Sequence, residues 1–139
     1  MGLLISEFIH LILGLVIGLI GFYLWKDKRL IWFSIAVSLL IDLDHLIDYW
    51  LFLGYLDLNP IRFLTTSYFG ASGKFYIIFH GWEYSIILLF LAGVYKKYKA
   101  YFLVAGMAIL AHLLFDVISN NMSLISYSII FRAINNFSF

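Results

Sequence analysis

Residues 3–25 form an apolar run, LLISEFIHLILGLVIGLIGFYLW, in which only Ser6, Glu7 and His10 are strongly polar. About 20 apolar residues in a helix span the hydrocarbon core of a bilayer, so this run is long enough to cross a membrane. It lacks a basic region before its apolar part, and no small-residue cleavage site precedes Lys26. We therefore expect a permanent transmembrane helix rather than a signal peptide.

The composition of the chain extends this interpretation to all 139 residues. Hydrophobic residues make up 64% and charged residues 12%, which leaves too little polar surface for a soluble domain. Further apolar runs cover residues 30–52, 75–95 and 100–119, and a shorter one covers 124–134. These runs predict an all-α fold: a polytopic transmembrane helix bundle of four spans plus a short C-terminal fifth or half-span, with residues 1–139 in a single integral membrane domain.

Charge and cysteine content exclude several classes of function. The net charge of +1 gives no reason to expect a nucleic-acid partner. The absence of cysteine excludes disulfides and thiolate metal ligands, so any metal must be held by histidine nitrogen and carboxylate oxygen.

The basic residues predict the orientation. Six of the nine Lys and Arg lie in short turns at 26–29 and 96–99, which fall on the same side if the spans alternate. The positive-inside rule then predicts an integral protein of the plasma (inner) membrane with its N-terminus outside. The connection at 53–74 is rich in Leu, Phe and Tyr, and we expect it to lie at the outer interface as a lid with glycines near its end.

The predicted spans also contain all four histidines and six of the eight carboxylates of the chain. Counted from the cytoplasmic end of each span at about 1.5 Å per residue, most of these side chains lie about 18 to 24 Å deep, in one layer of the outer half of the membrane. We call this set the polar belt; its members are Glu7, His10, Asp42, Asp44, His45, Asp48, His80, Glu83, His112 and Asp116.

Spacing within the polar belt indicates that it faces inward. Its members pair at i, i+3 or i, i+4, which places each pair on one helix face. A charge facing lipid is costly, and carboxylates gathered inside a bundle repel one another unless a cation neutralises them. We therefore predict one or two divalent ions, with zinc as the first choice. The predicted ligands are His10, Asp42, His45, His80, His112 and Asp116.

Other interpretations of the polar belt stay open at this stage. It could be a proton or ion pathway, or a structural network of helix–helix hydrogen bonds. Asp48 lies near the membrane surface and Glu7 near the N-terminus, where water could solvate them. On a regular helix Asp42 and Asp44 lie about 200° apart, so both cannot point squarely at one ion.

Three strings on successive spans carry a family resemblance. They are Asp42-Leu43-Asp44-His45, His80-Gly81-Trp82-Glu83-Tyr84-Ser85 and His112-Leu113-Leu114-Phe115-Asp116. With an early histidine at His10, their order resembles the YdjM-like family of membrane-bound metal-dependent hydrolases over residues 10–119. The chain departs from that pattern at Ile41, where the family has proline, and at Gly81, where it has arginine. Glu83 and Tyr84 stand in place of a second histidine.

The resemblance implies a metal-dependent hydrolase, and we expect it to cleave a phosphoester of a lipid or lipid-linked substrate at the outer leaflet. Glu83 or Asp44 is the expected general base if it is not itself a ligand, and Arg62 is expected to meet a substrate phosphate. The alternatives are a metal-ion or proton transporter that uses the same polar belt, and a partner subunit that holds a structural metal. Transport is less favoured because the inner halves of the spans are almost entirely apolar.

Overall fold

The computed structural model of the chain describes residues 3–65, 68 and 73–138. Within them the regular structure is helical, and the only β-type pairing is an isolated bridge between Lys74 and Ser138. The long elements are α1 (Leu3–Trp25), α2 (Arg29–Leu40), α3 (His45–Leu53), α5 (Trp82–Val94) and α6 (Lys99–Ser119). The short elements are the 3₁₀ turns η1 (Ile41–Asp44), η2 (Lys96–Tyr98) and η3 (Leu124–Tyr127), and the helices α4 (Pro60–Thr65) and α7 (Ile129–Ile134).

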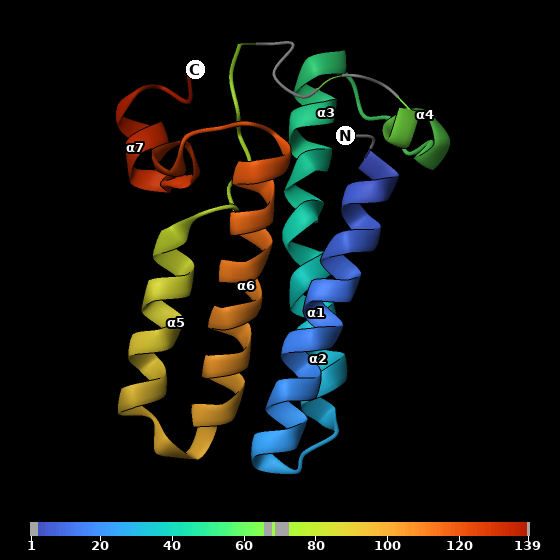
Figure 1. Cartoon of the computed structure of the whole chain (residues 1–139). Helices are drawn as coiled ribbons and strands as arrows, with labels where there is room; N and C mark the ends of the chain where they lie inside the picture. The colour runs from blue at the N-terminus through green and yellow to red at the C-terminus, as the bar shows by residue number, and fades with distance from the viewer. Residues whose placement is uncertain (1–2, 66–67, 69–72, 139) are drawn as a thin grey trace.

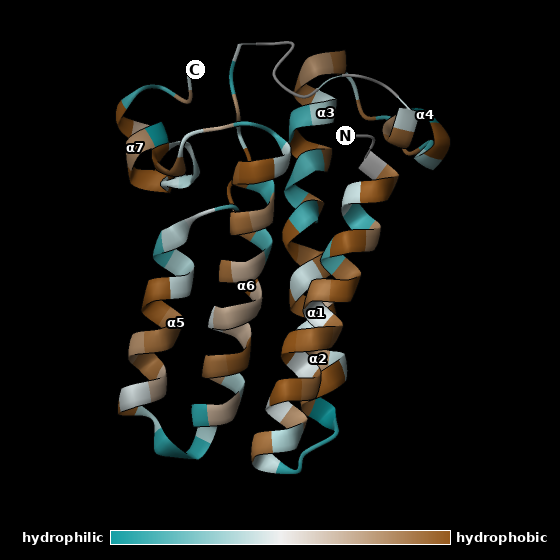
Figure 2. Ribbon diagram, viewed as in Figure 1, coloured by the Kyte–Doolittle hydropathy of each residue, from teal (hydrophilic) through white to brown (hydrophobic). Residues whose placement is uncertain are grey.

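Two helical hairpins stand side by side in the bundle (Figure 1). One pairs α1 with α2, which continues through η1 into α3; the other pairs α5 with α6. Contacts of α6 with α1 and α2 join the hairpins. The turns after α1 and after α5 lie at one end, while α4 and α7 lie at the other. Figure 2 shows polar residues at both turns and brown, apolar helix surfaces between the two ends.

Three helices are long and apolar enough to cross a membrane: Leu4–Trp25, Arg29–Leu53 and Lys96–Ser119. These support a membrane protein with an all-helical fold. The third predicted span, residues 75–95, is only partly helical, because α5 has 13 residues and so reaches about 20 Å, short of the roughly 30 Å hydrocarbon core. The C-terminal apolar run forms only η3 and α7, and the six residues of α7 are too few to span.

The predicted third span is wrong over residues 75–81, which are not helical. This segment is nevertheless buried, with Ile77 1% and His80 0% exposed. Its backbone groups find side-chain partners in place of helical ones. Asp48 accepts from the Tyr76 N–H at 2.7 Å, and Asp44 accepts from the Phe79 N–H at 2.6 Å. Non-helical backbone at membrane depth is tolerated when protein groups satisfy it in this way.

Small residues let α1 and α2 approach closely. A Cβ atom added to Gly18 would lie 2.7 Å from the Ile31 Cα, and one added to Gly14 would lie 2.9 Å from the Ser38 Cβ. This small-xxx-small packing is typical of membrane helices. The Ser38 hydroxyl also donates to the His10 carbonyl at 2.9 Å, so the same contact fixes the position of His10.

The turn after α1 is tied to α6. Arg29 Nη2 lies 2.9 Å from Asp27 Oδ2, and the Tyr101 hydroxyl donates to the same oxygen at 3.0 Å. Hydrogen bonds from Arg29 lower the pKa of Asp27 to about 2. The carboxylate therefore stays charged at neutral pH and can hold the turn against α6.

Part of the predicted lid cannot be placed. Of the connection at 53–74, the structure describes residues 53–65, 68, 73 and 74. Residues 66–67 and 69–72, which include most of the glycine-containing stretch, lie outside the described residues.

Candidate metal centre

The six predicted metal ligands form one contact network toward the end of the bundle away from the basic turns. Each of the six side chains belongs to a residue that is at most 9% exposed. They come from α1, from the η1–α3 junction, from the extended segment before α5, and from α6. The topology therefore brings together residues separated by as many as 106 positions in the sequence.

Four of their atoms lie close together, and five of the six distances among them are 3.2 to 3.5 Å. His80 Nε2 is 3.2 Å from His112 Nε2 and 3.2 Å from Asp42 Oδ1. Asp116 Oδ2 lies 3.2 Å from His112 Nε2 and 3.5 Å from His80 Nε2. His112 Nε2 lies 3.4 Å from Asp42 Oδ1. We call this set the four-atom cluster: His80 Nε2, His112 Nε2, Asp42 Oδ1 and Asp116 Oδ2.

These distances match the edges of a zinc coordination tetrahedron. Zinc bonds of about 2.0–2.1 Å to nitrogen and oxygen place neighbouring ligand atoms about 3.3–3.4 Å apart in tetrahedral geometry. When both Nε2 atoms are deprotonated, the two ring nitrogens and two carboxylate oxygens present lone pairs to one another, which a cation at their centre would neutralise. The buried His and Asp groups could therefore hold a metal ion.

Asp44 lies behind His80 rather than in the four-atom cluster. Its carboxylate oxygens lie 3.1 Å from His80 Nδ1, on the opposite side of the ring from Nε2. Asp44 favours the tautomer with the proton on Nδ1, in which Nδ1–H donates to this carboxylate and the Nε2 lone pair is directed at the four-atom cluster. Asp42 and Asp44 therefore do not need to face one ion, because they contact opposite nitrogens of the same imidazole.

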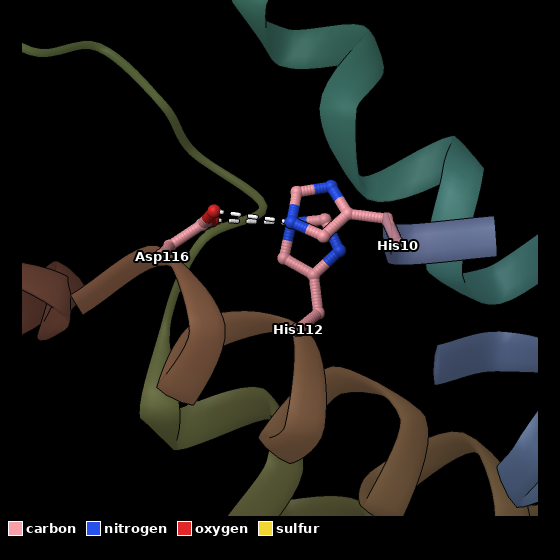
Figure 3. Close-up of side chains that lie close together, drawn as sticks. All are labelled: His10, His112 and Asp116. Atoms are coloured by element: carbon pink, nitrogen blue, oxygen red, sulfur yellow. Dashed lines mark hydrogen bonds and ion pairs between the residues drawn. The ribbon is translucent and has the colours of Figure 1, made fainter. Parts of the chain in front are cut away.

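His10 contacts both carboxylates of the four-atom cluster from the side. Its Nδ1 lies 3.0 Å from Asp42 Oδ2 and its Nε2 lies 3.1 Å from Asp116 Oδ1. Figure 3 shows its ring over that of His112, and the ring centroids are 3.6 Å apart. His45 is more peripheral, with its Nε2 3.5 Å from Asp42 Oδ1.

Two other predicted site residues are not brought to this network. Glu83 accepts from the Ser128 hydroxyl at 2.5 Å and from the N–H groups of Ile129 and Ile130, so it binds the N-terminal end of α7. Arg62 is about half exposed and its Nη1 lies 3.1 Å from Asp57 Oδ2. Glu83 therefore has a structural partner in α7. The Arg62 guanidinium is paired with a carboxylate of the same 53–74 connection.

Sequence reasoning missed Arg132. This residue is 2% exposed, and its guanidinium donates to the carbonyls of Ile77 at 2.6 Å and His80 at 2.5 Å. Arg132 therefore fixes the backbone that carries His80. A signal was present, because Arg132 is the only Lys or Arg after Lys99 and it stands in the apolar string IIFRAI.

No family model, curated protein or solved structure matches this chain. The resemblance to the YdjM-like family therefore stays a prediction from the three motifs. What the chain does has to be inferred from the geometry of its own residues.

Proposed function

We propose that this protein is a membrane-embedded metal-dependent hydrolase that cleaves a phosphoester of a lipid or lipid-linked substrate at the outer leaflet. The observation that carries the proposal is the four-atom cluster, whose spacing of 3.2 to 3.5 Å fits a tetrahedral divalent ion. Buried ionisable groups within membrane helices usually serve function, because burying them costs stability.

Zinc is the ion that suits these donors best. Mixed imidazole and carboxylate ligands at tetrahedral spacing favour zinc, whereas magnesium and calcium prefer six or more oxygen ligands. His80, His112, Asp42 and Asp116 would hold the ion. When bound, such an ion lowers the pKa of a coordinated water and polarises a phosphoryl oxygen.

Residues around the four-atom cluster support this role by positioning. Asp44 fixes the tautomer and the ring orientation of His80 through the bond to Nδ1. Arg132 holds the His80 carbonyl. With both the ring and the backbone of His80 held, its Nε2 stays aimed at the position where an ion would bind.

The depth of the polar belt in the bilayer supports a lipid phosphoester as the substrate. The polar belt lies about 22 Å from the basic turns, counted along the helices, and so within reach of the headgroup region at the other face. If the basic turns are cytoplasmic, as the positive-inside rule predicts, that face is the outer leaflet.

The apolar lining of the half of the bundle near the basic turns is evidence against transport. A groove of ≈ 220 Å³ between α1 and α6 is lined by Ile17, Ile20, Gly21, Leu24, Trp25, Leu103, Val104 and Met107. None of these side chains has an oxygen acceptor that could bind a passing cation, and the Trp25 indole offers only an N–H donor. An ion that left the four-atom cluster would meet no polar path to that end through this groove.

The test is metal content followed by turnover. We expect the protein purified in lipid nanodiscs to retain zinc and to release water-soluble phosphate or phosphorylated headgroup from lipid vesicles. His112→Ala should abolish release, while Asp27→Asn at the opposite end should leave it unchanged. A folded protein that binds no divalent ion would refute the proposal. Metal flux in proteoliposomes without phosphoester cleavage would replace it with transport.

A further inference from the structure

We infer that a second divalent cation binds beside the first, on Glu7, His10 Nδ1 and the outer carboxylate oxygen of Asp42, to form a dinuclear centre bridged by Asp42. This inference rests on the proposed function, since it presupposes a first ion at the four-atom cluster. It adds a ligand, Glu7, and assigns which residues serve which ion.

Both aspartates of the four-atom cluster have a second oxygen that points toward His10. Asp42 contributes Oδ1 to the four-atom cluster, and its Oδ2 lies 3.0 Å from His10 Nδ1. Asp116 contributes Oδ2, and its Oδ1 lies 3.1 Å from His10 Nε2. Asp42 therefore has one oxygen at each position, while Asp116 Oδ1 lies on the other nitrogen of His10. Two-metal sites typically hold their ions about 3.5–4 Å apart.

Glu7 completes the second position. It lies three residues before His10 on α1 and therefore on the same helix face. Ligand atoms of Glu7, His10 and Asp42 all lie within 4.8 Å of one another. Among the described residues, no N–H or O–H group donates a hydrogen bond to the Glu7 carboxylate, so its oxygens are available for a cation.

The contacts of His10 also call for a cation. A neutral imidazole has one N–H, yet both ring nitrogens lie about 3 Å from carboxylate oxygens. In the neutral ring with its N–H on Nε2 donating to Asp116 Oδ1, the Nδ1 lone pair faces Asp42 Oδ2, and a proton or a cation must supply positive charge between them. A divalent ion on the Nδ1 side would bind that lone pair together with Asp42 Oδ2 and Glu7.

A second ion also supplies what a hydrolase needs. The four protein atoms of the four-atom cluster would fill a tetrahedral zinc shell, so a water would join that ion only as a fifth ligand. The second position draws on Glu7, which is only half-buried, on His10 and on the shared Asp42. A five-coordinate ion there would keep a place for water or a phosphate oxygen, and two ions together can hold both the attacking and the leaving oxygen.

The experiment counts ions and measures their coupling. The full-length protein in nanodiscs is stripped with chelator and titrated with Mn²⁺, followed by elemental analysis and electron paramagnetic resonance. We expect about two ions per chain and an exchange-coupled spectrum, as dinuclear sites show. Glu7→Gln should bind half as many ions and give an uncoupled spectrum, whereas Asp27→Asn should match the wild type.

The outcomes separate the two proposals. One ion per chain in both the wild type and Glu7→Gln overturns the second site but leaves the first. Two coupled ions in Glu7→Gln also overturn it. No bound ion in the folded wild type overturns the proposed function as well. If Glu7→Gln fails to elute as a monodisperse species, His10→Gln gives the same comparison.

Discussion

Asp44→Asn tests whether the orientation of His80 controls metal binding. The asparagine oxygen can still accept from the Phe79 N–H, a bond that is 2.6 Å long in the native protein. Its amide cannot replace both carboxylate oxygens, however, which lie 3.1 Å from His80 Nδ1. The imidazole then loses its preference for a proton on Nδ1, and a proton on Nε2 would occupy the metal position.

Loss of such a supporting carboxylate typically lowers metal affinity 10- to 100-fold, which corresponds to about 1.4–2.7 kcal/mol. We expect this decrease in a zinc titration against a competing fluorescent chelator at pH 7. Asp48→Asn is the matched control, because Asp48 accepts from the Tyr76 N–H of the same extended segment. An unchanged affinity in Asp44→Asn, or an equal loss in Asp48→Asn, would refute this role for Asp44.

Three further predictions concern packing and orientation. Gly18→Leu should destabilise the bundle by about 1–3 kcal/mol in a detergent thermal-shift assay, because its Cβ would lie 2.7 Å from the backbone of α2. Gly93→Leu, where a Cβ meets nothing within 4 Å, should change the melting temperature little. Arg132→Leu should cost about 3 kcal/mol or more in the same assay, since two buried carbonyls lose a charged donor. Because the chain has no cysteine, single cysteines at Lys28 and Asn121 should react with impermeant maleimide from opposite sides of the membrane; labelling from one side only would contradict the predicted topology.

The long helices could be predicted because continuous apolar sequence specifies them locally. The predicted run at 3–25 coincides with α1, and the run at 100–119 differs from α6 by one residue. Residues 41–44 and 75–81 also lie within predicted spans, yet they form a 3₁₀ turn and an extended segment. Those conformations depend on partners distant in the sequence, which hydrophobic periodicity does not reveal.

Glu83 shows the same limit of sequence-based prediction in the candidate site. Its pairing with His80 assumed one continuous helix, on which i, i+3 residues share a face. Because α5 begins at Trp82, the two side chains leave the chain from different backbone conformations. The predicted depth of His80 depended less on this assumption, since His80 lies only two residues before the first residue of α5. Arg132 was missed because only the tertiary fold places α7 against residues 77–80.

The extended segment at 75–81 has a consequence for how this protein is made. Two of its N–H groups donate to Asp44 and Asp48, which are synthesised earlier. The Phe75 N–H donates to the Phe137 carbonyl, and two carbonyls of the segment accept from the Arg132 guanidinium, which emerges 52 to 55 residues later. During translation the segment would therefore leave the aqueous phase only after α7 is complete. We expect chains that end before Ser128 to insert α1, α2–α3 and α6 but to leave this segment open to protease. Bilayer insertion and maturation of the metal centre would then be separate events, with the last helix of the chain governing the second.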